Sequence, residues 1–308
     1  MRVTLLYNPV SGNRPEQRRA ILERVAVALR ARNTDVEVIR TEAPASAGSQ
    51  ATDACARGAD IVFACGGDGT IHDTLQGMVF QPHAALGVLP LGSANALARH
   101  LRLHLDPVRA ALQQLDRTPR IVPVGHITCQ TSDGPRERYF TVMAGAGPDG
   151  ALVYKMLARG KQSLGRSAYY LRAARLFLGS RFAPFTLTCT PSGAERVASF
   201  RAASAMAVRV GDLGGLFSPL VRGGSLEHSH MVLAAALPPA RFSLPAWFAS
   251  SWTRLGRLNP YVRTLHVDGF HCGTDESQPV QVQADGEWIG QTPMTVKLVP
   301  GALRLLLP

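Results

Sequence analysis

The sequence predicts an α/β domain with a Rossmann-like parallel sheet, followed by a mainly antiparallel β-sandwich domain. Apolar runs alternate with helical patterns over residues 2–101, a glycine-rich turn follows the third run, and the later chain reads mostly as short strands. The 308 residues are 46% hydrophobic, which is enough for two cores. We place the domains at residues 1–122 and 123–308, and allow the last strands to return to the first domain.

The first domain is predicted from four strands, each followed by a helix. The expected strands are 2–7, 36–39, 61–65 and 86–89, because each is a short apolar run bounded by loop residues. The expected helices are 15–32, 46–57, 70–78 and 93–101. Pro15 can open the first helix and Ser93 can cap the last. This order implies a parallel sheet with helices on both faces.

The second domain is predicted from turn signals that separate short strands. Paired strands are expected in 121–145, around a turn at residues 132–135. Helices are expected at 149–158, 165–179 and 244–258. Further strands are expected at 184–190, 196–210, 230–237, 262–268, 279–284, 294–299 and 302–307. Such a series is typical of an antiparallel sandwich.

Composition narrows the choice of partners and of compartment. The formal net charge of +11 favours anionic partners, but the arginines are dispersed, so we expect no nucleic-acid partner. The five cysteines are scattered without a CxxC pair, which argues against a disulfide framework and a zinc site. No secretory signal pattern is present, and the apolar runs are too short to span a bilayer. We expect a cytoplasmic protein that can contact an anionic membrane peripherally.

The clearest candidate site is the turn Gly66-Gly67-Asp68-Gly69-Thr70 after the third strand. Glycines let the backbone approach an anion closely, and the N-terminus of the following helix favours phosphate. Two more loops, 8–13 and 90–95, follow the first and fourth strands. Ligands of doubly wound sheets lie beyond the carboxyl ends of the strands, so these loops are expected to share one crevice. Each loop alone is also compatible with ordinary turn chemistry.

Three further features are less specific. Asp285 and Glu287 flank Gly286, and one of these acids can accept a proton from a hydroxyl, although a hairpin turn with solvated acids explains them as well. The arginine-rich stretch 155–181 fits acidic headgroups or a solvated helical face. His228 and His230, two residues apart, form a poor metal pair by themselves and are interpreted as surface residues.

Taken together, the motifs resemble the diacylglycerol kinase catalytic-domain superfamily, and within it the bacterial lipid kinases related to sphingosine kinases. The motifs, in order, are NPVSG, TE near residue 41, GGDGTIH, PLGSANALAR, AGAGPDG, SLGRSAYYL and DGEWIGQTP. The resemblance covers nearly the whole chain. GGDGT alone also occurs in NAD kinases and phosphofructokinases, whereas NPVSG and the late DGE with TP indicate lipid kinases.

The resemblance implies an α/β domain like that of NAD and diacylglycerol kinases, a β-sandwich, and ATP-dependent phosphorylation of a lipid hydroxyl. Glu287 is then the general base, and Asp68 helps to organise magnesium and phosphate. The implied nucleotide-binding residues are Asn8, Pro9, Ser11, Gly12, Thr41, Gly66, Gly67, Asp68, Gly69, Thr70, Ser93 and Asn95. The implied cofactors are ATP and Mg²⁺. A lipid such as a diacylglycerol or a long-chain base is the implied substrate, and exposed sandwich edges are compatible with a homodimer.

The sequence departs from the family at three places where relatives carry acids. Ala96, Pro123 and His228 stand there, so a structural magnesium site is not predicted and the metal ligands stay unassigned. Magnesium that arrives with ATP is less affected. Two alternatives remain open: a kinase of a soluble nucleotide such as NAD, and a non-catalytic module that binds nucleotide or lipid.

Overall fold

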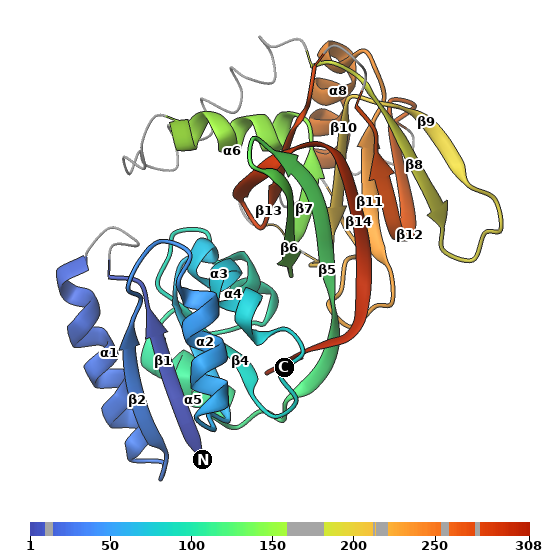
Figure 1. Ribbon diagram of the computed structural model, residues 1–308. Helices are drawn as coiled ribbons and strands as arrows, with labels where there is room; N and C mark the ends of the chain where they lie inside the picture. The colour runs from blue at the N-terminus through green and yellow to red at the C-terminus, as the bar shows by residue number, and fades with distance from the viewer. Residues whose placement is uncertain (10–14, 159–181, 212, 214–220, 254–258, 275–277) are drawn as a thin grey trace. The chain divides into compact units, whose positions relative to one another are not determined.

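The chain divides into two units, which we describe separately. The structure, a computed structural model, describes residues 1–9, 15–158, 182–211, 213, 221–253, 259–274 and 278–308. One unit consists of Met1–Val124 with Pro300–Pro308, and the other of Gly125–Val299 (Figure 1). Both β5 (Arg120–Thr131) and β14 (Glu287–Leu305) contain residues of the two units.

The first unit contains the predicted parallel sheet, in the order β2-β1-β3-β4. The strands are β1 (Arg2–Tyr7), β2 (Asp35–Arg40), β3 (Ile61–Gly66) and β4 (Ala85–Pro90). Every pairing among them is parallel, and β3 and β4 are buried along their whole length. Continuous burial is what apolar runs without a polar face predict.

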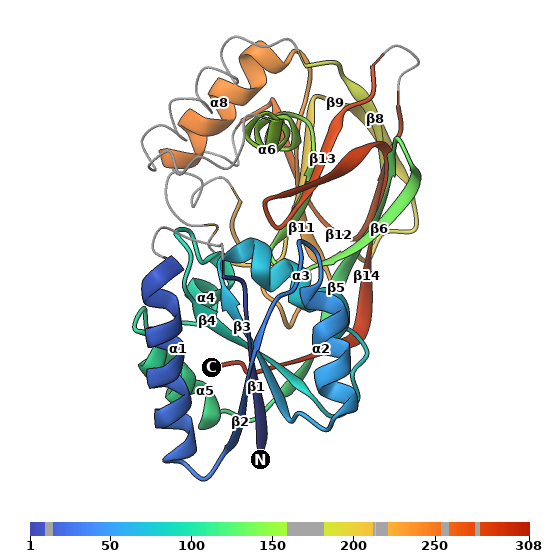
Figure 2. The same cartoon turned by 60° about the vertical axis from the view of Figure 1, so that its left-hand side comes forward.

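Helices cover both faces of this sheet, as the alternation predicts (Figure 2). They are α1 (Pro15–Arg30), α2 (Ala47–Ala56), α3 (Asp68–Met78), α4 (Ala96–His100) and α5 (Pro107–Leu115). α1 packs with α5, and α2 packs with α3. α5 is an addition to the prediction: the Asp106 carboxylate accepts a hydrogen bond from the Arg109 N–H, and Pro107 occupies the first turn.

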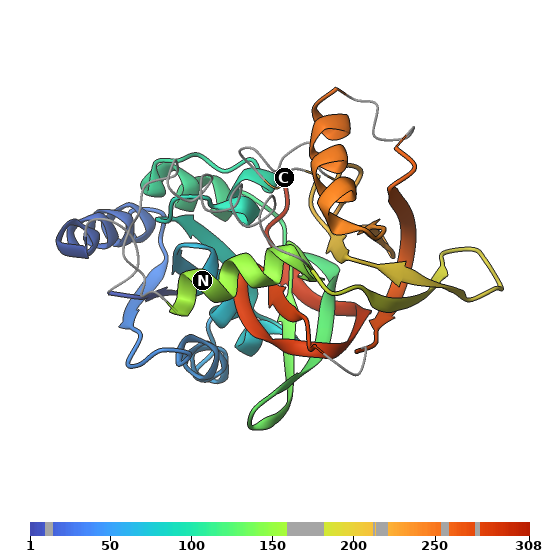
Figure 3. The ribbon, with the colours of Figure 1, turned by 90° about the horizontal axis from the view of Figure 1, so that it is seen from above.

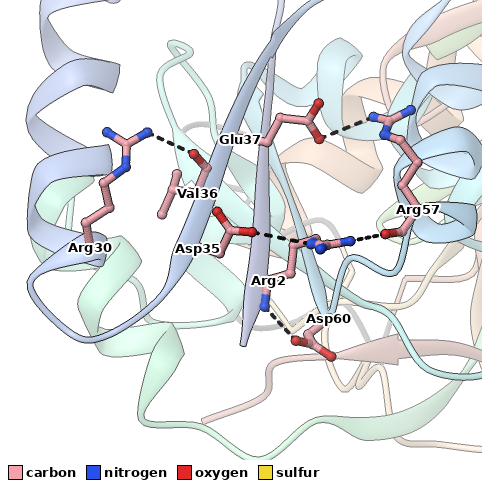
Figure 4. Close-up of polar contacts among 7 residues, drawn as sticks. All are labelled: Arg2, Arg30, Asp35, Val36, Glu37, Arg57 and Asp60. Atoms are coloured by element: carbon pink, nitrogen blue, oxygen red, sulfur yellow. Dashed lines mark hydrogen bonds and ion pairs between the residues drawn. The ribbon is translucent and has the colours of Figure 1, made fainter.

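Polar contacts hold together the edge of the sheet where its strands begin (Figure 4). The Arg2 N–H donates to Asp60 Oδ2 at 2.6 Å, and the Arg2 guanidinium bonds the carbonyl of Arg57 and lies 3.4 Å from Asp35 Oδ2. These groups are solvent-exposed, and exposed ion pairs contribute at most about 1 kcal/mol each. The contacts lie at the opposite end of the strands from the glycine-rich turn.

The C-terminal segment completes the first unit. The end of β14 pairs in parallel with β4 through Leu305 and Leu86. The Arg117 guanidinium also donates to the Leu306 carbonyl at 3.0 Å, and the Phe80 N–H donates to the Ala302 carbonyl at 2.7 Å.

The second unit is mostly antiparallel β structure. Besides parts of β5 and β14, its strands are β6 (Gly134–Phe140), β7 (Met143–Ala146), β8 (Phe185–Pro191), β9 (Ala198–Ala202), β10 (Ser204–Val208), β11 (Met231–Ala236), β12 (Val262–Cys272) and β13 (Gln281–Ala284). The order β13-β7-β10-β11-β12-β8-β9 is antiparallel throughout, and β14 pairs with both β13 and β12. Figure 3 shows the strands of this unit from above. Buried side chains from most of these strands form its core.

Several predicted boundaries are corrected. The expected strand 196–210 is two strands, β9 and β10, and the expected strands 294–299 and 302–307 form the single strand β14. The helix expected at 244–258 is α8 (Ala240–Trp252), which begins after Pro239 and includes Pro245. α6 (Pro148–Ala158) matches the prediction, whereas the helix expected at 165–179 lies outside the described residues. Within the described chain, no helix is long and apolar enough to cross a membrane.

Candidate functional site

The glycine-rich turn joins the buried end of β3 directly to α3. Gly67 is the N-cap and Asp68 the first helical residue. A Cβ on Gly66 would lie 2.3 Å from Thr70 Oγ1, and a Cβ on Gly92 would lie 2.5 Å from the Gly67 Cα. The two predicted loops therefore pack backbone against backbone. The first N–H groups of a helix lack intrahelical partners and carry partial positive charge, so this turn has the chemistry that binds phosphate.

Asp68 links this turn to the loop after β4. Its carboxylate accepts hydrogen bonds from the N–H groups of Asn95 at 2.9 Å and Ala96 at 2.8 Å. The prediction that Ser93 caps this helix is wrong: α4 begins at Ala96, Asn95 is the N-cap in left-handed conformation, and Asp68 supplies the capping oxygens from 27 and 28 residues away. Ser93 is exposed in the loop. Asp68 thus fixes the arrangement of both loops.

The carboxyl ends of β1 and β2 bring further predicted residues to the same edge of the sheet. Asn8 follows β1, and Thr41, which is buried, donates its N–H to the Tyr7 carbonyl at 2.9 Å. Pro9 is described as part of a turn, whereas Ser11 and Gly12 lie outside the described residues.

Arg18 is a residue of this edge that sequence reasoning missed. It is only 5% exposed, and its guanidinium donates to the Asn8 carbonyl at 2.7 Å. Burial lowers the pKa of Arg18, and the nearby Cys65 thiol opposes that shift. The missed signal is its position four residues before Leu22, in line with the apolar face of α1. A buried cation that bonds to Asn8, directly after β1, makes Arg18 a positioning residue.

The close packing of the two loops predicts that even a methyl side chain at Gly92 will disturb the glycine-rich turn. On the prediction that this turn binds nucleotide phosphate, Gly92→Ala is expected to force the two loops apart and to weaken ATP binding about tenfold or more, because small displacements in a phosphate site are costly. The measurement is ATP titration by calorimetry. Gly273→Ala is the matched control, since its Cβ would meet only the Thr186 carbonyl at 3.7 Å. Unchanged ATP affinity in Gly92→Ala would contradict the packed-loop interpretation.

The positions where relatives carry acids belong to three different parts of the chain. Ala96 begins α4, Pro123 lies in β5, and exposed His228 stacks on His230 with ring centroids 4.8 Å apart. His230 in turn stacks on His266 at 4.6 Å. The described residues contain no group of three or more His, Cys, Asp or Glu side chains that could hold a metal ion.

In the second unit, the Asp285-Gly286 turn connects β13 to β14. Both turn residues have positive φ, 50° and 83°, as a two-residue hairpin requires. The reading of both acids as solvated is wrong for Asp285, which is only 8% exposed. Its carboxylate accepts three backbone N–H groups, from Thr141 at 3.0 Å, Val142 at 2.8 Å and Met143 at 3.1 Å.

A buried cation accompanies this carboxylate. Arg209 is fully buried and donates from Nη2 to the Leu226 carbonyl at 2.8 Å. Burial lowers the pKa of Arg209 to about 10, and the charge of Asp285 opposes the shift. A carboxylate bound by three amides near a buried arginine is fixed in place, so Asp285 acts as an anchor for the turn.

Glu287 is positioned by this anchored turn while its own carboxylate is left accessible. It begins β14 opposite Ala284 and is partly exposed. Its side chain makes no hydrogen bond or ion pair with the described residues. An accessible carboxylate on a rigid turn is what a general base requires.

Asp149 connects the AGAGPDG motif to the same turn. The Gln283 side chain, which is 1% exposed, donates to Asp149 Oδ2 at 3.0 Å and accepts from the Gly286 N–H at 3.0 Å. Asp149 is partly exposed as a residue, but its carboxylate points inward, and buried Oδ1 has no hydrogen-bond partner among the described residues. Burial raises the pKa of Asp149 to about 6, against the opposing hydrogen bond from Gln283.

This raised pKa predicts a pH-dependent stability difference. The folded state favours the protonated form of the Asp149 carboxyl. The contribution of this preference to the free energy of unfolding is therefore complete below the ordinary pKa of 3.8 and is lost as the pH rises through about 6. Asp149→Asn, which cannot ionise, is therefore expected to gain stability relative to the unmodified protein across this window, by at most about 3 kcal/mol. Urea unfolding at intervals from pH 4 to 8 measures the difference. A constant offset between the two proteins would contradict the assignment.

The fold and the glycine turn together define a class: a two-domain protein with an α/β unit and an antiparallel β unit, as in diacylglycerol and NAD kinases. Solved structures agree. A Bacillus anthracis protein named as a candidate diacylglycerol kinase matches all of this chain and 95% of its own, with a TM-score of 0.78 and 20% identity. Yeast NADH kinase complexed with NADH matches all of this chain and 83% of its own, with a TM-score of 0.52 and 12% identity. These likenesses confirm the predicted fold.

Sequence comparison narrows this class. Residues 2–127 match the diacylglycerol kinase catalytic domain. A diacylglycerol kinase of Staphylococcus haemolyticus is 30% identical over 169 residues, which cover 54% of this chain and 48% of that protein. One from Mycobacterium tuberculosis is 28% identical over 323 aligned positions, covering 100% and 95%. The match spans about half the length of the first relative and nearly all of the second. The predicted resemblance to the diacylglycerol kinase catalytic-domain superfamily is confirmed.

Proposed function

We propose that this protein is an ATP-dependent lipid kinase, which transfers the γ-phosphate to the hydroxyl of a lipid such as a diacylglycerol or a long-chain base. The observation that carries the proposal is the glycine turn of β3 and α3, packed against the loop after β4 and held there by Asp68. A side chain at Gly92 would collide with the Gly67 backbone, so the two loops approach each other closely only with glycine at that position. The names of the family relatives support the lipid acceptor.

Each group of the site has one role in this proposal. The first turn of α3 binds phosphate, Asp68 and Arg18 hold the surrounding loops, and Asn8, Pro9, Ser11, Gly12, Thr41, Ser93 and Asn95 line the nucleotide. Bound MgATP supplies the phosphoryl group and the divalent cation. Glu287 accepts the proton of the lipid hydroxyl. The hydroxyl oxygen forms the new bond to the γ-phosphorus, and the bond between that phosphorus and the ADP oxygen breaks. Positioning and charge neutralisation contribute most to such transfers.

The test is transfer of radiolabelled phosphate from ATP and magnesium to a total lipid extract, resolved by chromatography. A labelled lipid that is absent with the Glu287→Gln variant would establish both the activity and the class of acceptor. Labelling of NAD in a lipid-free reaction would instead indicate a kinase of a soluble nucleotide. NAD is the acceptor to test because the fold is similar to that of yeast NADH kinase. ATP binding with no labelled product from either source would indicate a non-catalytic module.

A further inference from the structure

Helix α8 buries one face in the second unit. Its buried residues are Ala240, Ser243, Leu244, Trp247 and Ser251, and the helix packs on β11. The buried face includes Leu244 and Trp247, which accounts for the docking of the helix. Docking on the sheet does not account for the apolar side chains on the rest of the helix.

The opposite face is apolar and exposed. Phe242 is 54% exposed, Phe248 38% and Trp252 52%. At about 100° per residue, Arg241, Phe248 and Trp252 fall within a sector of about 40°, and Phe242 lies about 80° further round the helix. The Phe248 and Trp252 rings are 6.4 Å apart, and the Arg241 guanidinium lies 4.8 Å above the Phe242 ring. We call these four residues the α8 patch. Exposed aromatic side chains that gather on one helix mark interaction surfaces more often than chance positions do, so the patch calls for an occupant.

The charge of the sequence that contains the patch restricts that occupant. No Asp or Glu occurs from residue 228 to residue 267, a stretch that contains four arginines, including Arg241 of the patch. The whole chain carries a formal charge of +11. A symmetric contact between two copies would bring Arg241 of one patch close to that of the other without an acid from this stretch to compensate. The arrangement instead matches an anionic surface.

We propose that the α8 patch docks the protein onto the surface of an anionic lipid bilayer. Phe and Trp side chains partition into the boundary between headgroups and acyl chains, and arginine pairs with lipid phosphate. The inference rests on the proposed function, since a lipid acceptor resides in a bilayer. Its readout, vesicle binding, is independent of phosphate transfer.

The experiment measures co-sedimentation of the full chain with vesicles of phosphatidylcholine, with and without phosphatidylglycerol. The unmodified protein is expected to bind the mixed vesicles, more weakly as salt increases. Phe248→Ser with Trp252→Ser, and separately Arg241→Glu, should each weaken binding about tenfold or more. Val197→Ser and Arg196→Glu are matched controls at exposed positions of the same unit and should bind normally. Tryptophan emission should shift to shorter wavelength on binding, and Trp252→Phe should remove most of that shift.

Three outcomes would overturn the proposal. They are normal vesicle binding by the double variant, equal losses in the controls, and a concentration-dependent dimer that the double variant abolishes. The last outcome would make a second copy the occupant. The two proposals can fail independently. Vesicle binding through α8 with no labelled lipid would contradict only the kinase assignment. Labelled lipid with normal vesicle binding by the double variant would contradict only the docking assignment.

Discussion

Replacing Glu287 by glutamine is expected to reduce phosphate transfer by about 10²- to 10⁴-fold, the usual contribution of a general base. Glutamine keeps the size of the side chain but cannot accept the proton of the hydroxyl. The Glu287 side chain makes no bond to the described residues, so folding and ATP binding should be unaffected. Initial rates with saturating ATP, together with ATP titration, measure the two effects.

The control for this substitution is Glu195→Gln, which changes an exposed glutamate of the same unit and should retain full activity. If Glu287→Gln transfers phosphate at the unmodified rate, Glu287 is not the base. If the variant loses ATP binding as well, its role lies in nucleotide binding instead.

Replacing Asp285 by alanine is expected to destabilise the protein by about 3–5 kcal/mol. The change leaves three backbone N–H groups without their acceptor and the buried Arg209 without its nearby negative charge. Asp285→Asn should cost less, because its carbonyl oxygen can still accept some of these bonds. Urea unfolding followed by circular dichroism measures both variants.

Asp133→Ala provides the matched control, since Asp133 lies in the exposed turn between β5 and β6, and surface changes of this kind usually stay within about 0.5 kcal/mol. Loss of activity in Asp285→Asn without any change in unfolding would show that Asp285 takes part in the reaction itself rather than anchoring the turn.

Local patterns were sufficient for the parallel sheet and its glycine turn. β1, β3 and β4 are short apolar runs, and the residues that end them, such as Gly66 and Pro90, are themselves strong loop signals. The end of a strand was expected near Pro300 and Gly301, and the structure differs there. The strand continues through both residues, yet the boundary between the two units falls at Pro300.

Roles that depend on distant partners had no local signal. Asp68 caps a helix 28 residues away, and Asp285 binds amides more than 140 residues earlier in the chain. Gln283, whose amide joins Asp149 to the DGE turn, reads in the sequence as an ordinary strand residue. Such functions arise only when the chain folds, because tertiary contacts decide which polar groups are buried together.

Because residues 300–308 belong to the first unit, they limit which fragments of the protein can fold. Ala302, Leu303, Leu305, Leu306 and Leu307 are all at most 5% exposed, and they belong to the unit formed by Met1–Val124. A recombinant fragment that ends near residue 127, where the family match stops, would lack this strand and leave the edge of β4 open to other chains. Such a fragment should aggregate, and restoring residues 300–308 through a short linker should give a monomeric α/β domain.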